Sequence, residues 1–396
     1  MCYNCEWKLY RKLPFSRAAQ TSVALFLVKM IDLAFCITEL NIGGAERALC
    51  ELAIRVDKSR FRVKVYSLQS RPVDDTVSCV PMLEAAGIPV RFLDMKGPTS
   101  FLPGFFRLRK LLKEQKPDIF LSFLFHANFL GRLAAQSIGI RHIVSGIRVA
   151  EHEKRWHLIL DRWTSRYVEK YVCVSDSVAD FTHAEAKIPS EKIVVIPNGI
   201  EMPDSVENSE RQNRIIFIGR LAYQKGLDWF LETVPTWLPK LPDWELWIVG
   251  DGEERKTLTD RLLAPAFDAV RDRTTLTGWR VDAPSLLAKS RMLVLPSRWE
   301  GMPNVILQAM AVGIPVVVTA VEGVLELLGP EAGEQTCVFG QSEVFSEKIL
   351  AIAKNELLAE RLGRMNRLRV NENFRLETVV ETYERFFENM IERRFS

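Results

Sequence analysis

Short apolar runs alternate with segments of helical pattern along almost the whole chain, and this rhythm limits the folds that the sequence can adopt. Each run is only long enough for one strand. Runs that are apolar throughout and alternate with helices are typical of repeated βα units in a parallel sheet. The sequence therefore predicts an α/β protein built from two Rossmann-like series, with strands at 31–37, 63–68, 90–93, 119–124, 142–147, 171–174 and 193–196, then at 215–218, 246–249, 275–276, 292–295, 316–318 and 337–339.

A turn-rich segment separates the two series. Residues 197–203 read PNGIEMP and lead into a polar stretch that ends at Asn213, which predicts an interdomain linker. A chain of 396 residues also exceeds what one hydrophobic core usually serves. We expect a first domain over 30–203 and a second over 204–374. The end of the chain has one long helical pattern, and we expect its C-terminal helix, at about 375–396, to pack back on the first domain.

The first 29 residues differ from the rest of the chain. They hold five basic residues against one acidic residue and a short apolar stretch without a small-residue cleavage site. We therefore expect an N-terminal extension of no assigned role, with Met30 as a natural start. The remaining body is close to neutral, which excludes a general basic field for nucleic acid. No apolar run reaches the ~18 residues that a membrane-spanning helix needs.

The cysteines indicate a reducing compartment. Seven of them, an odd number, are scattered along the chain, which is the usage of a cytoplasmic protein rather than a disulfide framework. Cys2 and Cys5 form a single Cys-x-x-Cys pair with no second pair and no nearby histidine, so a zinc site is not expected there. We expect a cytoplasmic protein without a metal.

One carboxylate lies where an anion is expected to bind. Residues 297–310 read SRWEGMPNVILQAM and follow the apolar strand at 292–295, so Glu300 precedes a helix predicted to start near Pro303. The first N–H groups of such a helix lack intrahelical partners and favour phosphate. Glu300 would repel phosphate, so we expect it to accept hydrogen bonds from neutral hydroxyls. A ligand with phosphate at one end and hydroxyls at the other is a nucleotide sugar.

Two cations follow the first strand of the second series. Arg220 comes directly after Gly219 at the strand end, and Lys225 follows as a helix opens. Ligands of α/β proteins bind at the carboxyl ends of strands, and an Arg fork with a Lys point charge suits a diphosphate. The alternative is a pair of solvated basic residues.

Several glycine loops occur at other predicted strand ends. Gly43 and Gly44 precede the first helix, where backbone N–H groups can face an oxyanion, although such a pair is often only a tight turn. The loops at Gly250 and at 278–280 would line one rim of the second sheet, where a nucleoside could lie. These candidate donor-binding residues are Gly43, Gly44, Gly219, Gly250, Gly278, Trp279 and Arg280.

In order and spacing these motifs resemble the retaining family 4 glycosyltransferases of the GT-B fold, also called glycosyl transferases group 1. The resemblance runs from Met30 to the C-terminus, through Gly43-Gly44-Ala45-Glu46, 196–200, Gly219-Arg220-Leu221, 249–252 and Glu300-Gly301-Met302-Pro303. It implies two facing Rossmann-like domains with the donor held by the second and the acceptor by the first.

The resemblance also implies residue roles. Arg220 and Lys225 would hold the donor diphosphate, the Gly44 loop would close on it from the other domain, and Glu300 would bind the sugar hydroxyls. The remaining donor contacts would come from Gly301, Met302, Pro303, Asn304, Val305 and Gln308. The family has a second glutamate at the position of Gln308; an amide can still bind ribose but loses a charge-assisted hydrogen bond of roughly 1 kcal/mol.

Other candidates lie in the first domain. His126 matches a position that approaches the donor sugar in several relatives, although a packed ring between phenylalanines explains it equally well. Arg148 and Glu151 are acceptor-side candidates because they follow the fifth strand. The helix predicted at 105–116 mixes aromatic, leucine and basic residues, which fits either contact with an anionic membrane or packing on the core.

We therefore expect a retaining glycosyltransferase of polysaccharide or glycolipid biosynthesis, acting by a front-face mechanism with Arg220, Lys225, Glu300 and His126 in the active site. The chain has no Asp-x-Asp motif, so we expect the two cations to replace a metal and no separate cofactor. The expected donor is a UDP-sugar rather than a GDP-sugar, and the expected acceptor is a glycan, a lipid-linked molecule or another acceptor. The cytoplasmic protein would have either no membrane contact or a peripheral one on the inner face of the membrane. A nucleotide-sugar epimerase and a non-catalytic nucleotide-sugar binding protein remain as alternatives.

Overall fold

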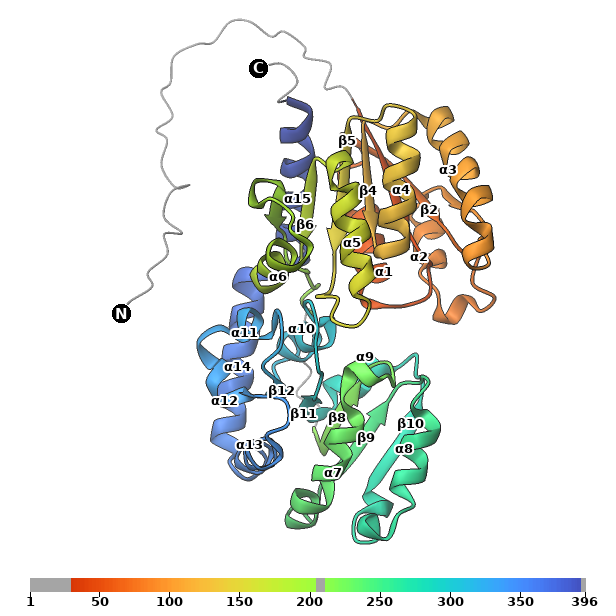
Figure 1. Cartoon of the computed structure of the whole chain (residues 1–396). Coiled ribbons are helices and arrows are strands. Elements are labelled where there is room, and N and C mark those ends of the chain that lie inside the picture. The colour runs from red at the N-terminus through yellow and green to blue at the C-terminus, as the bar shows by residue number, and fades with distance from the viewer. Residues whose placement is uncertain (1–29, 204–210, 393–396) are drawn as a thin grey trace, which may run out of the picture.

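The computed structural model describes residues 30–203 and 211–392, which form two parallel sheets covered by helices (Figure 1). The first sheet has seven strands in the order β3-β2-β1-β4-β5-β6-β7. Its strands are β1 Ile31–Ile37, β2 Phe61–Ser67, β3 Val90–Phe92, β4 Ile119–Phe123, β5 His142–Ile147, β6 Lys170–Cys173 and β7 Ile193–Val195. Its helices are α1 Gly44–Arg55, α2 Val80–Ala85, α3 Phe101–Gln115, α4 Phe125–Ser137, α5 Arg155–Thr164 and α6 Asp176–Ala186.

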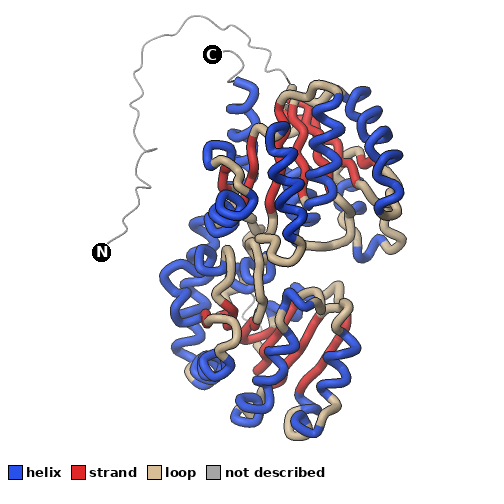
Figure 2. The backbone as a smooth tube through the Cα atoms, viewed as in Figure 1, coloured by secondary structure: helices blue, strands red, loops and turns tan. Residues whose placement is uncertain are grey.

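The second sheet has six strands in the order β10-β9-β8-β11-β12-β13. Its strands are β8 Gln212–Ile218, β9 Glu245–Val249, β10 Thr274–Gly278, β11 Ser290–Leu295, β12 Val316–Thr319 and β13 Thr336–Cys337. The helices that follow them are α7 Leu227–Trp237, α8 Arg255–Leu262, α9 Ala283–Ala288, α10 Asn304–Ala311, α11 Val324–Leu328, α12 Ala332–Gln335, α13 Ser342–Lys354, α14 Glu356–Asn373 and α15 Leu376–Glu392. Figure 2 shows strands and helices alternating in both halves, which confirms the predicted fold class.

The central strands are buried on both faces, as their composition requires. From Leu33 to Ile37 every side chain of β1 is fully buried, and parallel strands covered by helices on both sides have no polar face. The carboxyl edges of the two sheets face each other, because Ala150, after β5, donates its N–H to the carbonyl of Glu300, after β11. Loops at these edges therefore meet between the domains.

The chain crosses between the domains twice, and the two crossings are bonded together. The single helical pattern predicted over 369–394 is interrupted at Phe374 and Arg375: α14 packs in the core of the second domain, and α15 packs in the core of the first. Figure 1 shows α15 running along the upper domain. Ile200 donates to the carbonyl of Phe374 at 2.9 Å, and Leu376 donates to the carbonyl of Ile200 at 3.0 Å.

The second crossing explains why residue 199 is a glycine. A Cβ on Gly199 would lie 2.8 Å from the Cα of Leu376, so the first crossing accepts no larger residue beside α15. The expectations for residues 1–29, 204–210 and 393–396 lie outside the described residues.

We predict that α15 is an integral part of the first domain's core. Phe387 is fully buried and its ring lies 6.2 Å from that of Phe35 and 6.1 Å from that of Phe61. Phe387→Ala should lower the free energy of unfolding by about 3–5 kcal/mol, the usual cost of such a cavity, measured by urea unfolding. Arg385→Ala, exposed on the same helix, is the control; equal stability of the two variants would contradict this packing.

Candidate active site

Glu300 lies in the loop between β11 and α10, and its carboxylate is held by two neighbours. Lys225 Nζ donates to Oε1 at 2.5 Å, and Ser297 Oγ donates to the same oxygen at 2.6 Å. The residue is only 6% exposed, so a cation next to it partners an otherwise buried acid. Oε2 has no hydrogen-bond partner among the described residues and is left for a ligand.

The helix after this loop begins without a side-chain cap. Pro303 is the N-cap residue of α10, and no side chain bonds the first N–H groups; Asn304 and Val305 form its first turn. Unpaired N–H groups and the positive end of the helix dipole favour an anion here. An anion-binding helix end and a charged carboxylate therefore lie within one loop.

The two cations predicted for the diphosphate differ in their surroundings. Lys225 reaches Glu300 because β8 and β11 are neighbouring strands. The next residue, Gly226, has φ +65°, and a Cβ there would lie 2.1 Å from the carbonyl oxygen of Pro296. The side chain of Arg220 is exposed, and its guanidinium has no hydrogen bond or ion pair with another described residue. Lys225 is therefore held in place, whereas Arg220 is open to a ligand.

The glycine loops of the second domain lie side by side at its carboxyl edge. Gly219 donates its N–H to Val249, and Gly250 donates to Gly278; a Cβ on Gly250 would lie 1.9 Å from the carbonyl of Gly219. At the far end of this row, Trp279 is 42% exposed and Arg280 pairs with Asp282 at 2.6 Å. Strands β8 and β9 separate these last two residues from Glu300.

The first domain reaches the start of α10 through the Gly44 loop. The side-chain amide of Asn304 donates to the carbonyl of Gly44 at 3.1 Å. A Cβ on Gly43 would lie 2.2 Å from Glu46 Oε2. The carboxylate of Glu46 is thus folded back against Gly43.

Glu46 is a buried acid that was not assigned a role from the sequence. Burial raises its pKa to about 7, while Arg220 and Arg148 act in the opposite direction. The sequence signal that could have singled out Glu46 is an acidic residue in the first helical turn after a glycine pair.

The backbone after Glu300 is bonded to the first domain at successive residues. Ser175 Oγ donates to the carbonyl of Gly301 at 3.0 Å, and the side-chain amide of Asn198 donates to that of Met302 at 3.0 Å. A Cβ on Gly301 would lie 2.1 Å from the carbonyl of Arg148. The loop that carries Glu300 is therefore held by contacts with the opposite domain.

The acceptor-side candidates mainly hold the first domain together. Arg148 donates to Asn198 Oδ1 and lies 4.6 Å over the ring of Phe123, and burial lowers its pKa. Glu151 accepts from the backbone N–H of Lys154 at 3.0 Å and contacts His157 Nδ1 at 3.1 Å, so it fixes the start of α5.

His126 lies in the first turn of α4 within an aromatic cluster. Its ring centroid is 5.4 Å from Phe125 and 6.1 Å from His157. Burial, with a smaller contribution from Lys154, lowers its pKa, which favours the neutral imidazole. Both readings of this histidine, as a packed ring and as a ligand group, remain compatible with its place.

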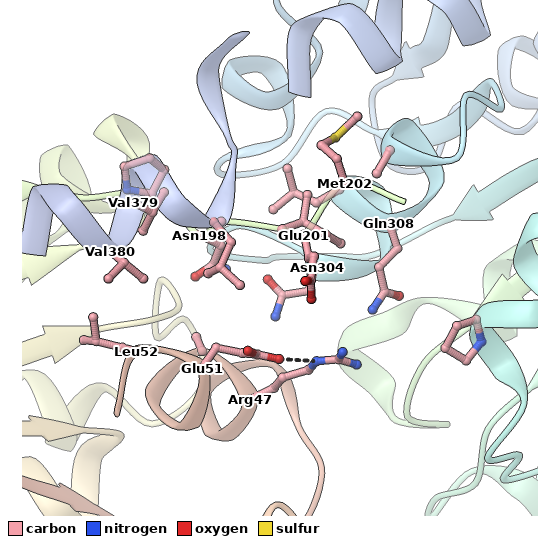
Figure 3. Close-up of a pocket in the computed structure, with 18 of the residues that line it drawn as sticks. Arg47, Glu51, Leu52, Asn198, Glu201, Met202, Asn304, Gln308, Val379 and Val380 are labelled. Carbon is pink, nitrogen blue, oxygen red and sulfur yellow. Dashed lines mark ion pairs between the residues drawn. The ribbon is translucent and has the colours of Figure 1, made fainter. Parts of the chain in front are cut away.

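A pocket of about 410 Å³ lies between α1, the 197–203 linker, α10 and α15. Figure 3 shows Gln308 and Asn304 of α10 facing Arg47 and Glu51 of α1 across it. Arg47 Nε lies 3.7 Å from Glu51 Oε1, and its guanidinium donates no hydrogen bond to a described residue. Gln308 thus shares a pocket with polar side chains of the opposite domain, which no sequence motif indicated. Among residues 30–203 and 211–392, no group of three or more His, Cys, Asp or Glu side chains is placed to hold a metal ion.

Both halves match known family models. Residues 42–202 match the model described as Glycosyltransferase Family 4, and residues 212–355 match Glycosyl transferases group 1. The chain is 30% identical to the UDP-Gal:α-D-GlcNAc-diphosphoundecaprenol α-1,3-galactosyltransferase of Escherichia coli, over 71% of this chain and 77% of that protein. It is 28% identical, with the same coverages, to a Campylobacter jejuni α-1,4-N-acetyl-D-galactosaminyltransferase named for a diNAcBac-PP-undecaprenol-linked glycan.

The fold has solved relatives as well. The Anabaena HepE protein in complex with UDP-glucose superposes with a TM-score of 0.77, covering 91% of this chain and 100% of that chain at 19% identity. With both halves matched and a relative aligned over most of its length, the chain belongs to the retaining family 4 glycosyltransferases (glycosyl transferases group 1) of the GT-B fold, which use nucleotide-sugar donors.

Proposed function

We propose that this chain transfers a hexose from a UDP-sugar, with retention, to a glycan carried on a polyprenyl diphosphate, in cell-envelope polysaccharide biosynthesis. The observation that carries the donor half is the contact of Lys225 with Glu300 beside the uncapped start of α10. The names of the Escherichia coli and Campylobacter jejuni relatives support the lipid-linked acceptor, and the UDP-bound structural relatives support the nucleotide.

In this proposal each end of the donor meets a different part of the site. The free Oε2 of Glu300 accepts hydrogen bonds from sugar hydroxyls, and Lys225 lies between that carboxylate and the diphosphate. Arg220 and the first N–H groups of α10 bind the phosphate oxygens. The nucleoside extends toward Gly250 and 278–280, with Gln308 at the ribose.

The reaction follows a front-face path. The bond from the anomeric carbon to the diphosphate oxygen breaks, and the acceptor hydroxyl attacks the same face. Its proton passes to the departing phosphate oxygen. Charge grows on the diphosphate, and Arg220, Lys225 and the helix amides are preorganised to stabilise it.

A surface on the first domain supports contact with the membrane that carries such an acceptor. On α5 the side chains of Trp156, Ile159 and Trp163 are 53%, 68% and 54% exposed. The opposite face is anchored, because Asp161 accepts from the buried Arg132 at 2.5 Å. Exposed basic residues flank this stripe at Lys154, Arg162 and Arg166.

We propose that membrane contact is made mainly through α5 rather than through the basic helix singled out in the sequence. Leu108 and Leu112 of α3 are fully buried, so much of that helix's apolar face packs on the core, and Leu102 and Phe106 are its exposed apolar residues. No helix in the described part of the chain has the length and apolar character to cross a membrane.

We expect Lys225→Ala and Glu300→Ala each to lower kcat/KM by ~10²-fold or more, because each removes a contact to charge or hydroxyls in the transition state. The assay is transfer from UDP-galactose to a polyprenyl-diphosphate GlcNAc acceptor, with UDP-glucose as a second donor. Lys256→Ala, which removes an 89%-exposed lysine paired with Asp260, is the matched control. Wild-type turnover in either active-site variant would refute the assignment.

We expect transfer to continue in excess EDTA, because Arg220 and Lys225 supply the positive charge at the diphosphate. The measurement is the initial rate with and without chelator on enzyme dialysed against it. Loss of activity in EDTA that added Mg²⁺ or Mn²⁺ restores would show that this proposed mechanism is wrong.

We expect the double variant Trp156→Ala, Trp163→Ala to lose most binding to anionic vesicles of phosphatidylglycerol and phosphatidylethanolamine, because amphipathic surfaces bind through buried apolar area together with charge. Vesicle co-sedimentation measures this, with phosphatidylcholine vesicles as the neutral comparison. Leu357→Ala, which removes a 79%-exposed apolar residue on α14, serves as control. Sedimentation of the double variant equal to wild type would argue against this surface.

A further inference from the structure

Glu322 bridges the two domains directly beside the candidate sugar site. It lies in the loop between β12 and α11, and its Oε1 is 2.8 Å from Nε2 of His152 in the first domain. Its other oxygen, Oε2, accepts the backbone N–H of Glu300 at 3.3 Å. The side chain of Glu322 is 21% exposed and that of His152 is 43% exposed. The bridge therefore lies at the edge of the cleft rather than in a core.

Both backbone groups of Glu300 therefore depend on the segment 148–152. The N–H is bonded to Glu322, which His152 contacts, and the carbonyl accepts the N–H of Ala150 at 3.3 Å. No other hydrogen bond to these two backbone groups occurs among the described residues. The backbone of Glu300 is therefore held in part from the opposite domain, while Lys225 and Ser297 hold its carboxylate from within the second domain.

The surrounding loops leave little freedom for Glu322 to move. Gly323, directly after it, has φ +73° and a Cβ there would lie 2.0 Å from the carbonyl of Gly301. The ring of His152 lies 4.8 Å from Phe181 and 6.3 Å from Trp299, so aromatic neighbours from both domains flank it. The bridge is thus a fixed contact of the closed arrangement.

Electrostatics explains why the bridge needs its histidine. Glu322 brings a second carboxylate close to the backbone of Glu300, and a partly buried carboxylate is better placed when a hydrogen-bond donor faces it. The imidazole of His152 supplies such a donor, and it comes from the opposite domain. The contact that partners Glu322 therefore requires both domains in this arrangement.

We propose that Glu322 and His152 form a cross-domain latch that positions Glu300 for the donor sugar. This role rests on the proposed function of Glu300 as the group that binds sugar hydroxyls. Glu322 acts through Glu300 and is a positioning residue. The latch makes sugar binding and domain closure favour each other, because both require the same orientation of the Glu300 peptide.

UDP and UDP-galactose distinguish this role from a general effect, since UDP lacks the sugar that Glu300 would bind. For Glu322→Ala we expect the Kd of UDP to stay within about twofold of wild type. The ratio of the Kd of UDP-galactose to that of UDP should rise about tenfold, as for a lost charge-assisted hydrogen bond, and kcat should fall by a similar factor. Isothermal titration calorimetry gives both Kd values.

Two further variants test the coupling. His152→Ala should give the same tenfold change, and the double variant should be no worse than either single variant because the two residues act as one unit. Glu322→Gln should stay within about threefold of wild type, since an amide can accept from Glu300 and donate to a neutral imidazole. Glu334→Ala, which removes a carboxylate paired with Arg361 on the surface, is the control, and thermal unfolding checks that every variant is folded.

The latch is overturned if Glu322→Ala leaves the Kd ratio unchanged, if UDP binding falls in parallel, or if the two alanine effects multiply. These outcomes are read in a wild-type enzyme that binds and transfers the sugar. A wild-type protein that binds neither UDP-galactose nor UDP-glucose would instead overturn the proposed donor class, and the sugar-positioning role with it.

Discussion

The contact between Lys225 and Glu300 solves the main physical problem of this site. A buried carboxylate beside an anion-binding helix end is unfavourable on its own, both because it loses hydration and because it repels phosphate. Lys225 and Ser297 converge on one carboxylate oxygen, so the charge is compensated while the other oxygen stays available. In the proposed mode of binding, the same lysine also contacts the diphosphate.

This arrangement is only complete when the two sheets face each other. The backbone from Glu300 to Met302 receives hydrogen bonds from Ala150, Ser175 and Asn198 of the first domain and its linker, and Gly301 accepts that approach only because it has no side chain. The geometry of the loop that carries Glu300 is therefore a property of the interface rather than of the second domain alone. We therefore expect the geometry of this site to change when the domains open or close.

The sequence predicts well what is encoded locally. Each strand is a short apolar run, so all of them fall within a few residues of their predicted positions, and Glu300, Lys225 and the glycine loops lie at strand ends that such runs mark. The helical pattern itself continues across the break between α14 and α15, because residues on both sides keep it, and only the crossing between two cores separates the two helices. His152 and Glu322 lie 170 positions apart and belong to no shared motif. The direction in which α5 presents Trp156 also depends on its neighbours, which periodicity does not report.

The interface is polar and its individual contacts are modest, which suits an enzyme that must open to exchange ligands. The bond from Asn304 to Gly44 is exposed and the contact of His152 with Glu322 is half-exposed, so each contributes about 0.5–1.5 kcal/mol at most. A few such bonds favour closure without preventing opening, and the binding of a donor can shift the balance. The contacts at the two crossings between the domains are different. The crossings are hydrogen-bonded to each other at Ile200, and α15 is buried in the core of the first domain. Motion is therefore expected to open the rim that carries Glu322, Asn304 and Gly44 while the crossings stay together.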